Sequence, residues 1–284
     1  MNELLPSTTS MGAVTLWVAD LDLMIRYYRD GVGLDLLSHQ GSRAVLGFAH
    51  EEVVILEHKP GMKHASPHEA GLFHTAILFP SESALARAVY SVATKYPGTF
   101  TGSADHLVSK AFYFNDPENN GVELYWDRDR SQWSWVHGAI EMDTLFLDPN
   151  EFLREHLTEN EVDPHKKVGH VHLSVGSIPA AEDFYVRMLG FEKTMNWGGQ
   201  ALFVSAGGYH HHMAMNTWRS KGAGKRQLAL GLGNIKIELD LTDQLAETKS
   251  RLDFHKVESR TIDNGVTVED PWGNKVTLTA KESQ

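Results

Sequence analysis

The alternation of apolar and polar residues repeats along the chain, and the repeat predicts the fold. Residues 13–34 read AVTLWVADLDLMIRYYRDGVGL, residues 170–191 read HVHLSVGSIPAAEDFYVRMLGF, and the two stretches align without a gap. Each pattern predicts a short alternating strand and then a helix, which ends at Gly33 or at Gly190. Asp20 and Ser177 occupy the position where a side chain caps the first helical turn. Further strand-like runs follow each helix.

A second kind of unit follows each of these stretches. Residues 71–126 open with GLFHTAIL and close with FYFNDPENNGVELYW, and residues 231–280 open with GLGNIKIEL and close with VTVEDPWGNKVTLTA. Both contain a helical pattern, and both place an Asp-Pro turn before the last strand. The order is therefore βαβββ four times, and we number the modules one to four along the chain.

This order predicts an α+β fold in which four βαβββ modules pair into two curved, barrel-like mixed sheets. One module alone cannot close a sheet, so pairing is needed to protect the open edges. We expect an N-terminal domain over residues 1–137, a charge-rich linker over 138–167 and a C-terminal domain over 168–284.

Composition narrows the classes of function. The net charge of −11 and the lack of a basic face argue against nucleic acid as a partner. Cysteine is absent, which excludes disulfides, iron–sulfur clusters and thiolate zinc sites. The first residues do not resemble a signal peptide, and no run of 18 apolar residues predicts a membrane span. We therefore expect a cytoplasmic protein without a membrane partner, and a homo-oligomer stays open.

Candidate metal ligands fall at equivalent positions of the modules. The first-strand position is His74 in module two and His170 in module three, and the last strand of module two carries Glu123. Histidine and glutamate in the middle of apolar strands are costly unless they are paired or bind a metal. Taken singly, each could be a hydrogen-bonded core residue, but together they form one set of ligands.

The other two modules lack such ligands. Module one has Ala13 at the first-strand position, and module four has Asn234 there and Thr277 in its last strand. We therefore expect one metal site, formed where modules two and three face each other, and a second cup that is purely structural. Two histidines and one carboxylate are the ligand set of non-haem Fe(II) oxygenases.

These features resemble a known family. The GHVHLSV and FYFNDPENNGVELYW stretches are similar to the vicinal oxygen chelate superfamily, which includes glyoxalase I and extradiol ring-cleaving dioxygenases. The chain is most similar to two-domain catechol 2,3-dioxygenases over nearly its whole length. The resemblance implies a soluble enzyme of aromatic compound catabolism. It would insert O₂, the cosubstrate, into a small aromatic diol at Fe(II), with Mn(II) as an alternative metal.

The resemblance also implies roles for other residues. Tyr113 and His106 match residues that hydrogen-bond the catecholate, and they are expected to be catalytic. In GGYHHHMAM, the alignment favours His211 as the acid–base residue. Substrate binding is expected of three further histidines: His172, His210 and His212.

Two other functions stay open. A glyoxalase-like isomerase or lyase would use nickel or zinc and normally a second glutamate as base. The other is a metal-free small-molecule binding protein of the drug-sequestering kind, in which the match of the three candidate ligands to a metal site would be coincidental.

Overall fold

The structure is a computed structural model that describes residues 4–160 and 163–281. Its elements follow the four predicted modules. Module one consists of β1 (Ser10–Val18), α1 (Leu21–Arg26), the π-helical turn η1 (Tyr27–Gly31), β2 (Asp35–Gln40), β3 (Arg43–Phe48) and β4 (Glu51–His58). Module two consists of β5 (Gly71–Leu78), α2 (Glu82–Lys95), β6 (Phe100–Asp105), β7 (Ser109–Asn115) and β8 (Gly121–Asp127).

The second half of the chain repeats the order. The joining segment contains the short 3-10 turn η2 (Arg130–Gln132), β9 (Trp135–Val136), β10 (Ala139–Ile140) and α3 (Pro149–His156). Module three consists of β11 (Lys167–Ser174), α4 (Ile178–Glu182), the π-helical turn η3 (Asp183–Met188), β12 (Glu192–Trp197), β13 (Ala201–Ser205) and β14 (Met213–Asn216). Module four consists of β15 (Gly231–Leu239), α5 (Thr242–Phe254), β16 (Ser259–Ile262), β17 (Gly265–Glu269) and β18 (Lys275–Ala280).

The strand order confirms the predicted α+β fold. There are two eight-stranded sheets among the described residues, ordered β16-β17-β18-β15-β1-β4-β3-β2 and β12-β13-β14-β11-β5-β8-β7-β6. The first sheet joins modules four and one, and the second joins modules three and two. Both sheets are mixed, because β5 pairs with β8, and β15 with β18, in parallel, whereas the hairpins are antiparallel.

Two compact units make up the chain. One contains residues 15–62 and 74–169, and the other contains the chain before Thr15, residues 63–73 and the chain from His170 onward. The joining segment therefore belongs to the first unit. The proposed division into domains at residues 138–167 stays a prediction.

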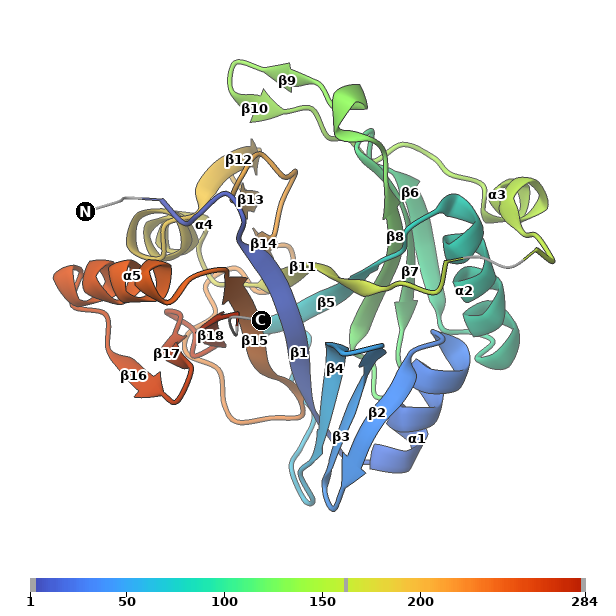
Figure 1. The fold of residues 1–284 in the computed structure, drawn as a ribbon, viewed down its shortest axis with the longest axis horizontal. Helices are drawn as coiled ribbons and strands as arrows, with labels where there is room; N and C mark the ends of the chain where they lie inside the picture. The colour runs from blue at the N-terminus through green and yellow to red at the C-terminus, as the bar shows by residue number, and fades with distance from the viewer. Residues whose placement is uncertain (1–3, 161–162, 282–284) are drawn as a thin grey trace. The chain divides into compact units, whose positions relative to one another are not determined.

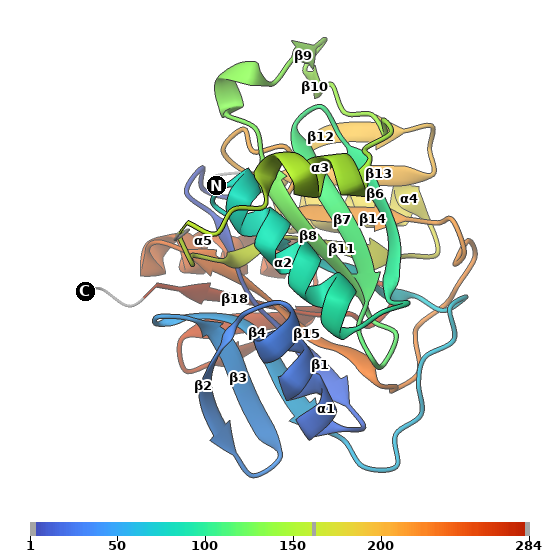
Figure 2. The ribbon, with the colours of Figure 1, turned by 90° about the vertical axis from the view of Figure 1, so that its right-hand side faces the viewer.

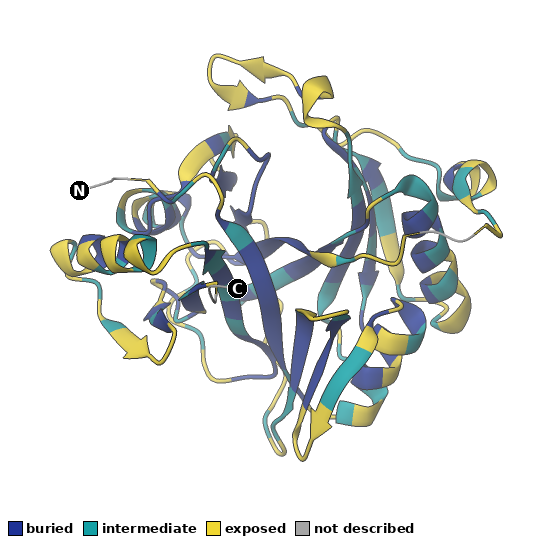
Figure 3. Ribbon diagram, in the orientation of Figure 1, coloured by how far each residue is buried: buried dark blue, intermediate teal, exposed yellow. Residues whose placement is uncertain are grey.

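Within the first unit, helices cover one face of the β6–β8 hairpins. Figures 1 and 2 show α2 and α3 side by side on that face. In α2 the buried side chains include Leu85, Val89 and Val92, which lie on one stripe of the helix, and Figure 3 shows the opposite side of the helix exposed. Apolar burial against the sheet is what holds this helix in place.

The local signals in the repeated stretches are confirmed. The carboxylate of Asp20 accepts from the backbone N–H of Leu23, and Ser177 caps α4 in the same way. Gly33 and Gly190 have positive φ angles of 85° and 95°, a conformation that costs glycine little. The sequence did not predict that both helices widen into a π-helical turn before these glycines.

A buried hydrogen bond from tyrosine to aspartate joins module one to module two, and an equivalent bond joins module three to module four. The hydroxyl of Tyr28 donates to Asp116 over 3.0 Å, and the hydroxyl of Tyr185 donates to Asp270 over the same distance. Both carboxylates lie in the predicted Asp-Pro turns. Burial raises the pKa of Asp116 to about 6, although hydrogen bonds from Asn120 and Tyr28 oppose the shift.

None of the helices in the described part of the chain has an apolar stretch that is long enough to cross a membrane.

Candidate metal centre

Strand register brings three polar side chains of module two to one face of its sheet. In the parallel pair of β5 and β8, Ala76 lies opposite Glu123, and in the antiparallel pair of β7 and β8, Tyr113 lies opposite Glu123. His74 is two residues before Ala76, so its side chain emerges on the same face. The pleat of the sheet therefore directs an imidazole, a carboxylate and a phenol to the same side.

His74 and Glu123 are in direct contact. The Nε2 atom of His74 lies 2.9 Å from Oε2 of Glu123, and the two residues are only 6% and 2% exposed. Two ligand atoms bound to one ion at right angles, each about 2.1 Å from it, lie about 3.0 Å apart. The observed separation therefore suits neighbouring ligands of one cation.

The third predicted ligand completes the set. One ligand atom from each of His74, Glu123 and His170 lies within 4.8 Å of the other two, and all three residues are buried. The donor set is two neutral nitrogen ligands and one anionic oxygen ligand. This composition fits a divalent transition metal and leaves further coordination positions for other molecules.

Polar contacts continue from Glu123 to Tyr113 and from Tyr113 to His106. The Nε2 atom of His106 and the hydroxyl of Tyr113 lie 2.6 Å apart, and Nδ1 of His106 donates to the carbonyl oxygen of Asp143 over 2.7 Å. Burial and the negative charge of Glu123 raise the pKa of the Tyr113 hydroxyl well above its usual value. Tyr113 therefore keeps its proton at neutral pH and can donate a hydrogen bond.

His170 lies on β11 and packs against two of the three consecutive histidines. Its ring centroid is 4.1 Å from that of His211 and 6.1 Å from that of His210. The Nδ1 atoms of His210 and His211 lie 2.7 Å apart, so one ring must donate to the other. The ring of His211 is therefore closer to the His170 ring than the ring of His210 is.

His212 and His172 have other surroundings. His212 packs against Phe191 and Tyr209, and its Nδ1 atom accepts from the backbone N–H of Ala206 over 3.2 Å. His172 packs against Trp218, and its Nε2 atom lies 3.0 Å from Nδ2 of Asn216. These contacts give both histidines a structural role, and their part in substrate binding stays a prediction.

Module four contains a neutral counterpart of the same chain. Thr277 and Asn234, which stand where Glu123 and His74 stand in module two, share a 2.8 Å hydrogen bond. The Oγ1 atom of Thr267, at the position of Tyr113, is 3.1 Å from that of Thr277. The geometry of the strands is therefore retained while the metal-binding groups are replaced.

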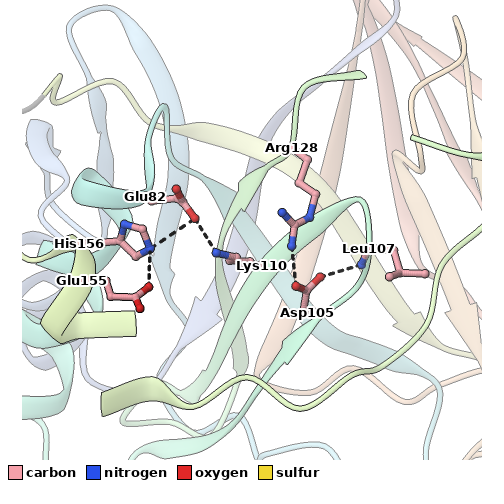
Figure 4. A network of polar contacts seen from close by, with 7 residues as sticks. All are labelled: Glu82, Asp105, Leu107, Lys110, Arg128, Glu155 and His156. Carbon is pink, nitrogen blue, oxygen red and sulfur yellow. Dashed lines mark hydrogen bonds and ion pairs between the residues drawn. The ribbon is translucent and has the colours of Figure 1, made fainter. Parts of the chain in front are cut away.

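A second polar network lies near β6 and β7, and Figure 4 shows its two parts. Lys110 forms an ion pair with Glu82 over 2.7 Å, and His156 lies 3.5 Å from the same carboxylate. Asp105 pairs with Arg128. These residues join α2, α3 and the β6–β8 hairpins, and none of them was a predicted site residue.

The backbone partner of His106 could not be predicted from the sequence. The Asp143 carbonyl lies in the segment that was predicted to be a linker, and a backbone acceptor leaves no trace in residue type.

A surface hollow of about 450 Å³ beside α4 is lined by Pro179, Asp183 and Asn196, among others. None of the predicted site residues lines this hollow, so it is not the candidate centre.

Known proteins resemble this chain in sequence. A model of the Glyoxalase/Bleomycin resistance protein/Dioxygenase superfamily matches residues 10–124 and 167–278. A protein of Bacillus subtilis (strain 168), named catechol-2,3-dioxygenase, is 33% identical over 270 residues, covering 93% of this chain and 94% of the relative.

Solved structures share the fold at lower identity. One from Bacillus subtilis (subsp. subtilis str. 168) superposes with a TM-score of 0.67 at 12% identity, covering 96% of this chain and 86% of the other. Glyoxalase I from Zea mays superposes with a TM-score of 0.59 at 16% identity, covering 96% and 92%. Because the family model matches both halves of the sequence, the chain belongs to the glyoxalase/bleomycin resistance protein/dioxygenase superfamily.

Proposed function

We propose that this protein is an extradiol ring-cleaving dioxygenase, which inserts O₂ into catechol-type substrates at a non-haem Fe(II) centre. The observation that carries the proposal is the buried contact between His74 and Glu123, with a ligand atom of His170 within 4.8 Å. The similarity to a relative named catechol-2,3-dioxygenase supports the same chemistry. The proposed substrate is a small aromatic diol.

The proposed metal ligands are His74, Glu123 and His170. When bound, Fe(II) supplies the one-electron chemistry that a spin-paired catechol needs in order to react with O₂, and Mn(II) is the alternative. The Glu123 carboxylate offsets part of the cation's charge. Its burial, with that of His74, keeps competing water away from the ligands.

Tyr113 and His106 are proposed to act on the catechol oxygens. The raised pKa of Tyr113 keeps its hydroxyl protonated, so it can donate to Glu123 or to a negatively charged substrate oxygen. The carbonyl of Asp143 fixes His106 with a proton on Nδ1, which directs Nε2 towards Tyr113. The Tyr113 hydroxyl carries one proton, so it donates to one acceptor at a time: Nε2 of neutral His106, Glu123 or a substrate oxygen.

His211 is the proposed acid–base residue. Its ring packs against the His170 ring at 4.1 Å, and its Nδ1 atom is engaged by His210. The His211 ring therefore lies beside a proposed metal ligand, where an imidazole can exchange a proton with a substrate. We further propose that His172, His210 and His212 support substrate binding. A cytoplasmic location stays a prediction.

Metal analysis combined with turnover tests the proposal. The protein is purified without oxygen, loaded with Fe(II) and assayed with catechol in air. About one iron per chain and a yellow ring-opened product are the expected results. Nickel or zinc with turnover of a thiol adduct would instead indicate a glyoxalase-like enzyme. No stoichiometric metal, together with tight binding of a small molecule, would indicate a binding protein.

A further inference from the structure

A short strap covers the free edge of β6. The backbone N–H of Asp105 donates to the carbonyl of Leu145 over 3.1 Å, and the N–H of Leu145 donates back over 2.9 Å. The hydroxyl of Ser103 donates to the carbonyl of Leu147 over 2.7 Å. Residues 143–147, which we call the edge strap, therefore run antiparallel to the last strand of that sheet.

The edge strap is anchored at its C-terminal end. Asp148 caps α3 by accepting from the backbone N–H of Asn150, and Phe152 of α3 packs against Phe112 with ring centroids 4.8 Å apart. His156, at the end of α3, lies beside the Lys110–Glu82 ion pair in Figure 4. The strap therefore enters a packed helix directly and has little freedom to move.

Register places one large side chain of the strap on the face of the candidate centre. The bridge pairs Leu145 with Asp105, and the hydrogen bond from Ser103 to Leu147 fits the same antiparallel register; continued by one residue, this register sets Phe146 beside Ala104. Ala104 in turn pairs with Ala111, which belongs to the apolar cluster against which Tyr113 packs. Side chains of directly opposed residues share a face, so Phe146 is on the side of Tyr113.

The exposure of Phe146 is unusual for a residue on such a well-fixed backbone. The residue is 88% exposed, the largest value among the exposed large apolar residues of the described chain. Scattered exposed apolar residues are normal on protein surfaces and need no function. This one is three residues from the Asp143 carbonyl that holds His106, so the strap that orients His106 also presents an unpacked aromatic ring.

We propose that Phe146 is a substrate-contact residue, which packs on the aromatic ring of the diol and limits the ring substituents that the enzyme accepts. The inference rests on the proposed function. A ring held in advance on a rigid strap loses little conformational freedom when it binds a flat aromatic molecule. Aromatic pairs in offset or edge-to-face contact also attract each other beyond the area that they bury.

The test compares Phe146→Ala with Phe254→Ala, since Phe254 is also exposed (71%) but lies at the end of α5. For Phe146→Ala we expect KM for catechol to rise about tenfold, with kcat within about twofold of the parent. Catechols with a bulky 4-substituent should gain in kcat/KM relative to catechol. Phe254→Ala should change neither quantity, and the iron content of both variants should match the parent.

Two results would overturn the inference while the parent enzyme is active. One is an unchanged KM and an unchanged preference among substituted catechols in Phe146→Ala. The other is a change in oligomeric state by light scattering without a change in KM, which would make Phe146 a contact between copies. If the iron-loaded parent cleaves no diol, the proposed function fails instead. Binding of 4-nitrocatechol then tests Phe146 separately, and an unchanged Kd would overturn its role.

Discussion

Exchanging the metal-binding pair for its neutral counterpart tests the candidate centre against the protein's own internal control. The double variant His74→Asn, Glu123→Thr gives module two the pair found in module four, where Asn234 and Thr277 are hydrogen-bonded at 2.8 Å. It should lose iron binding and keep the fold. His74→Ala alone should also lose iron, but it leaves the buried Glu123 carboxylate without its histidine neighbour.

The expected magnitudes follow from the contact that is lost. The 2.9 Å contact of His74 with the Glu123 carboxylate contributes at most about 3 kcal/mol, and the neutral hydrogen bond that replaces it contributes about 0.5–1.5 kcal/mol, so the double variant should lose at most about 2 kcal/mol of unfolding free energy. His74→Ala should lose about 3 kcal/mol, because the buried Glu123 carboxylate loses its contact with the imidazole and no other polar group replaces it. The loss in His74→Ala is larger because the Glu123 carboxylate is only 2% exposed and water cannot replace the missing imidazole.

Urea unfolding in the presence of a chelator measures both losses, and metal analysis of Fe(II)-loaded samples measures iron retention. The control is Asn234→Ala, which alters the corresponding strand of module four and should leave iron at the level of the parent. Stoichiometric iron in the double variant would refute the assignment of the ligands. If the double variant and His74→Ala were equally destabilised, the buried Glu123 carboxylate would not be the source of the larger loss.

Three further predictions concern the proton-bearing residues. Tyr113→Phe should retain iron and lower kcat about 10–100-fold, because the hydroxyl that contacts Glu123 and His106 is gone; steady-state kinetics with an unchanged kcat would contradict this. His211→Ala should retain iron and lower kcat about 100-fold or more, whereas an active His211→Ala beside an inactive His210→Ala would show that the acid–base role belongs to His210. Burial raises the pKa of Asp116 from its ordinary value of 3.8 to about 6, so the protonated carboxyl stabilises the fold at low pH. This stabilisation is complete below about pH 4, is lost as the pH rises through 6, and amounts to about 3 kcal/mol. Asp116→Asn should remove this slope from unfolding free energies measured by urea between pH 4.5 and 7, and a slope equal to the parent's would contradict it.

The repeat made most of the fold predictable. A gap-free match between residues 13–34 and 170–191 fixes two strands and two helices, and the cap residues Asp20 and Ser177 mark where the helices start. Period-two and helical patterns report burial on one face, which is why they predict elements well. The positions of His74 and Glu123 within their modules were likewise sufficient to expect their contact.

Other parts of the site depend on contacts that residue type does not encode. The acceptor for His106 is a backbone carbonyl, and the role of Phe146 follows only from the register of the edge strap against β6. His211 and His212 are adjacent and chemically identical, yet one packs against His170 and the other against Phe191. Only the course of the backbone between β13 and β14 separates them.

The proposed function requires that His74, Glu123 and His170 hold one iron for ring cleavage. Its most direct test is the iron content of anaerobically loaded protein, measured together with oxygen uptake in the presence of catechol, for the parent and for His74→Ala, Glu123→Ala and His170→Ala. We predict about one iron per chain and oxygen uptake equal to the catechol consumed in the parent, and the loss of both in all three variants. An iron content that any of these variants retains in full, or oxygen uptake that does not depend on iron, would contradict the claim.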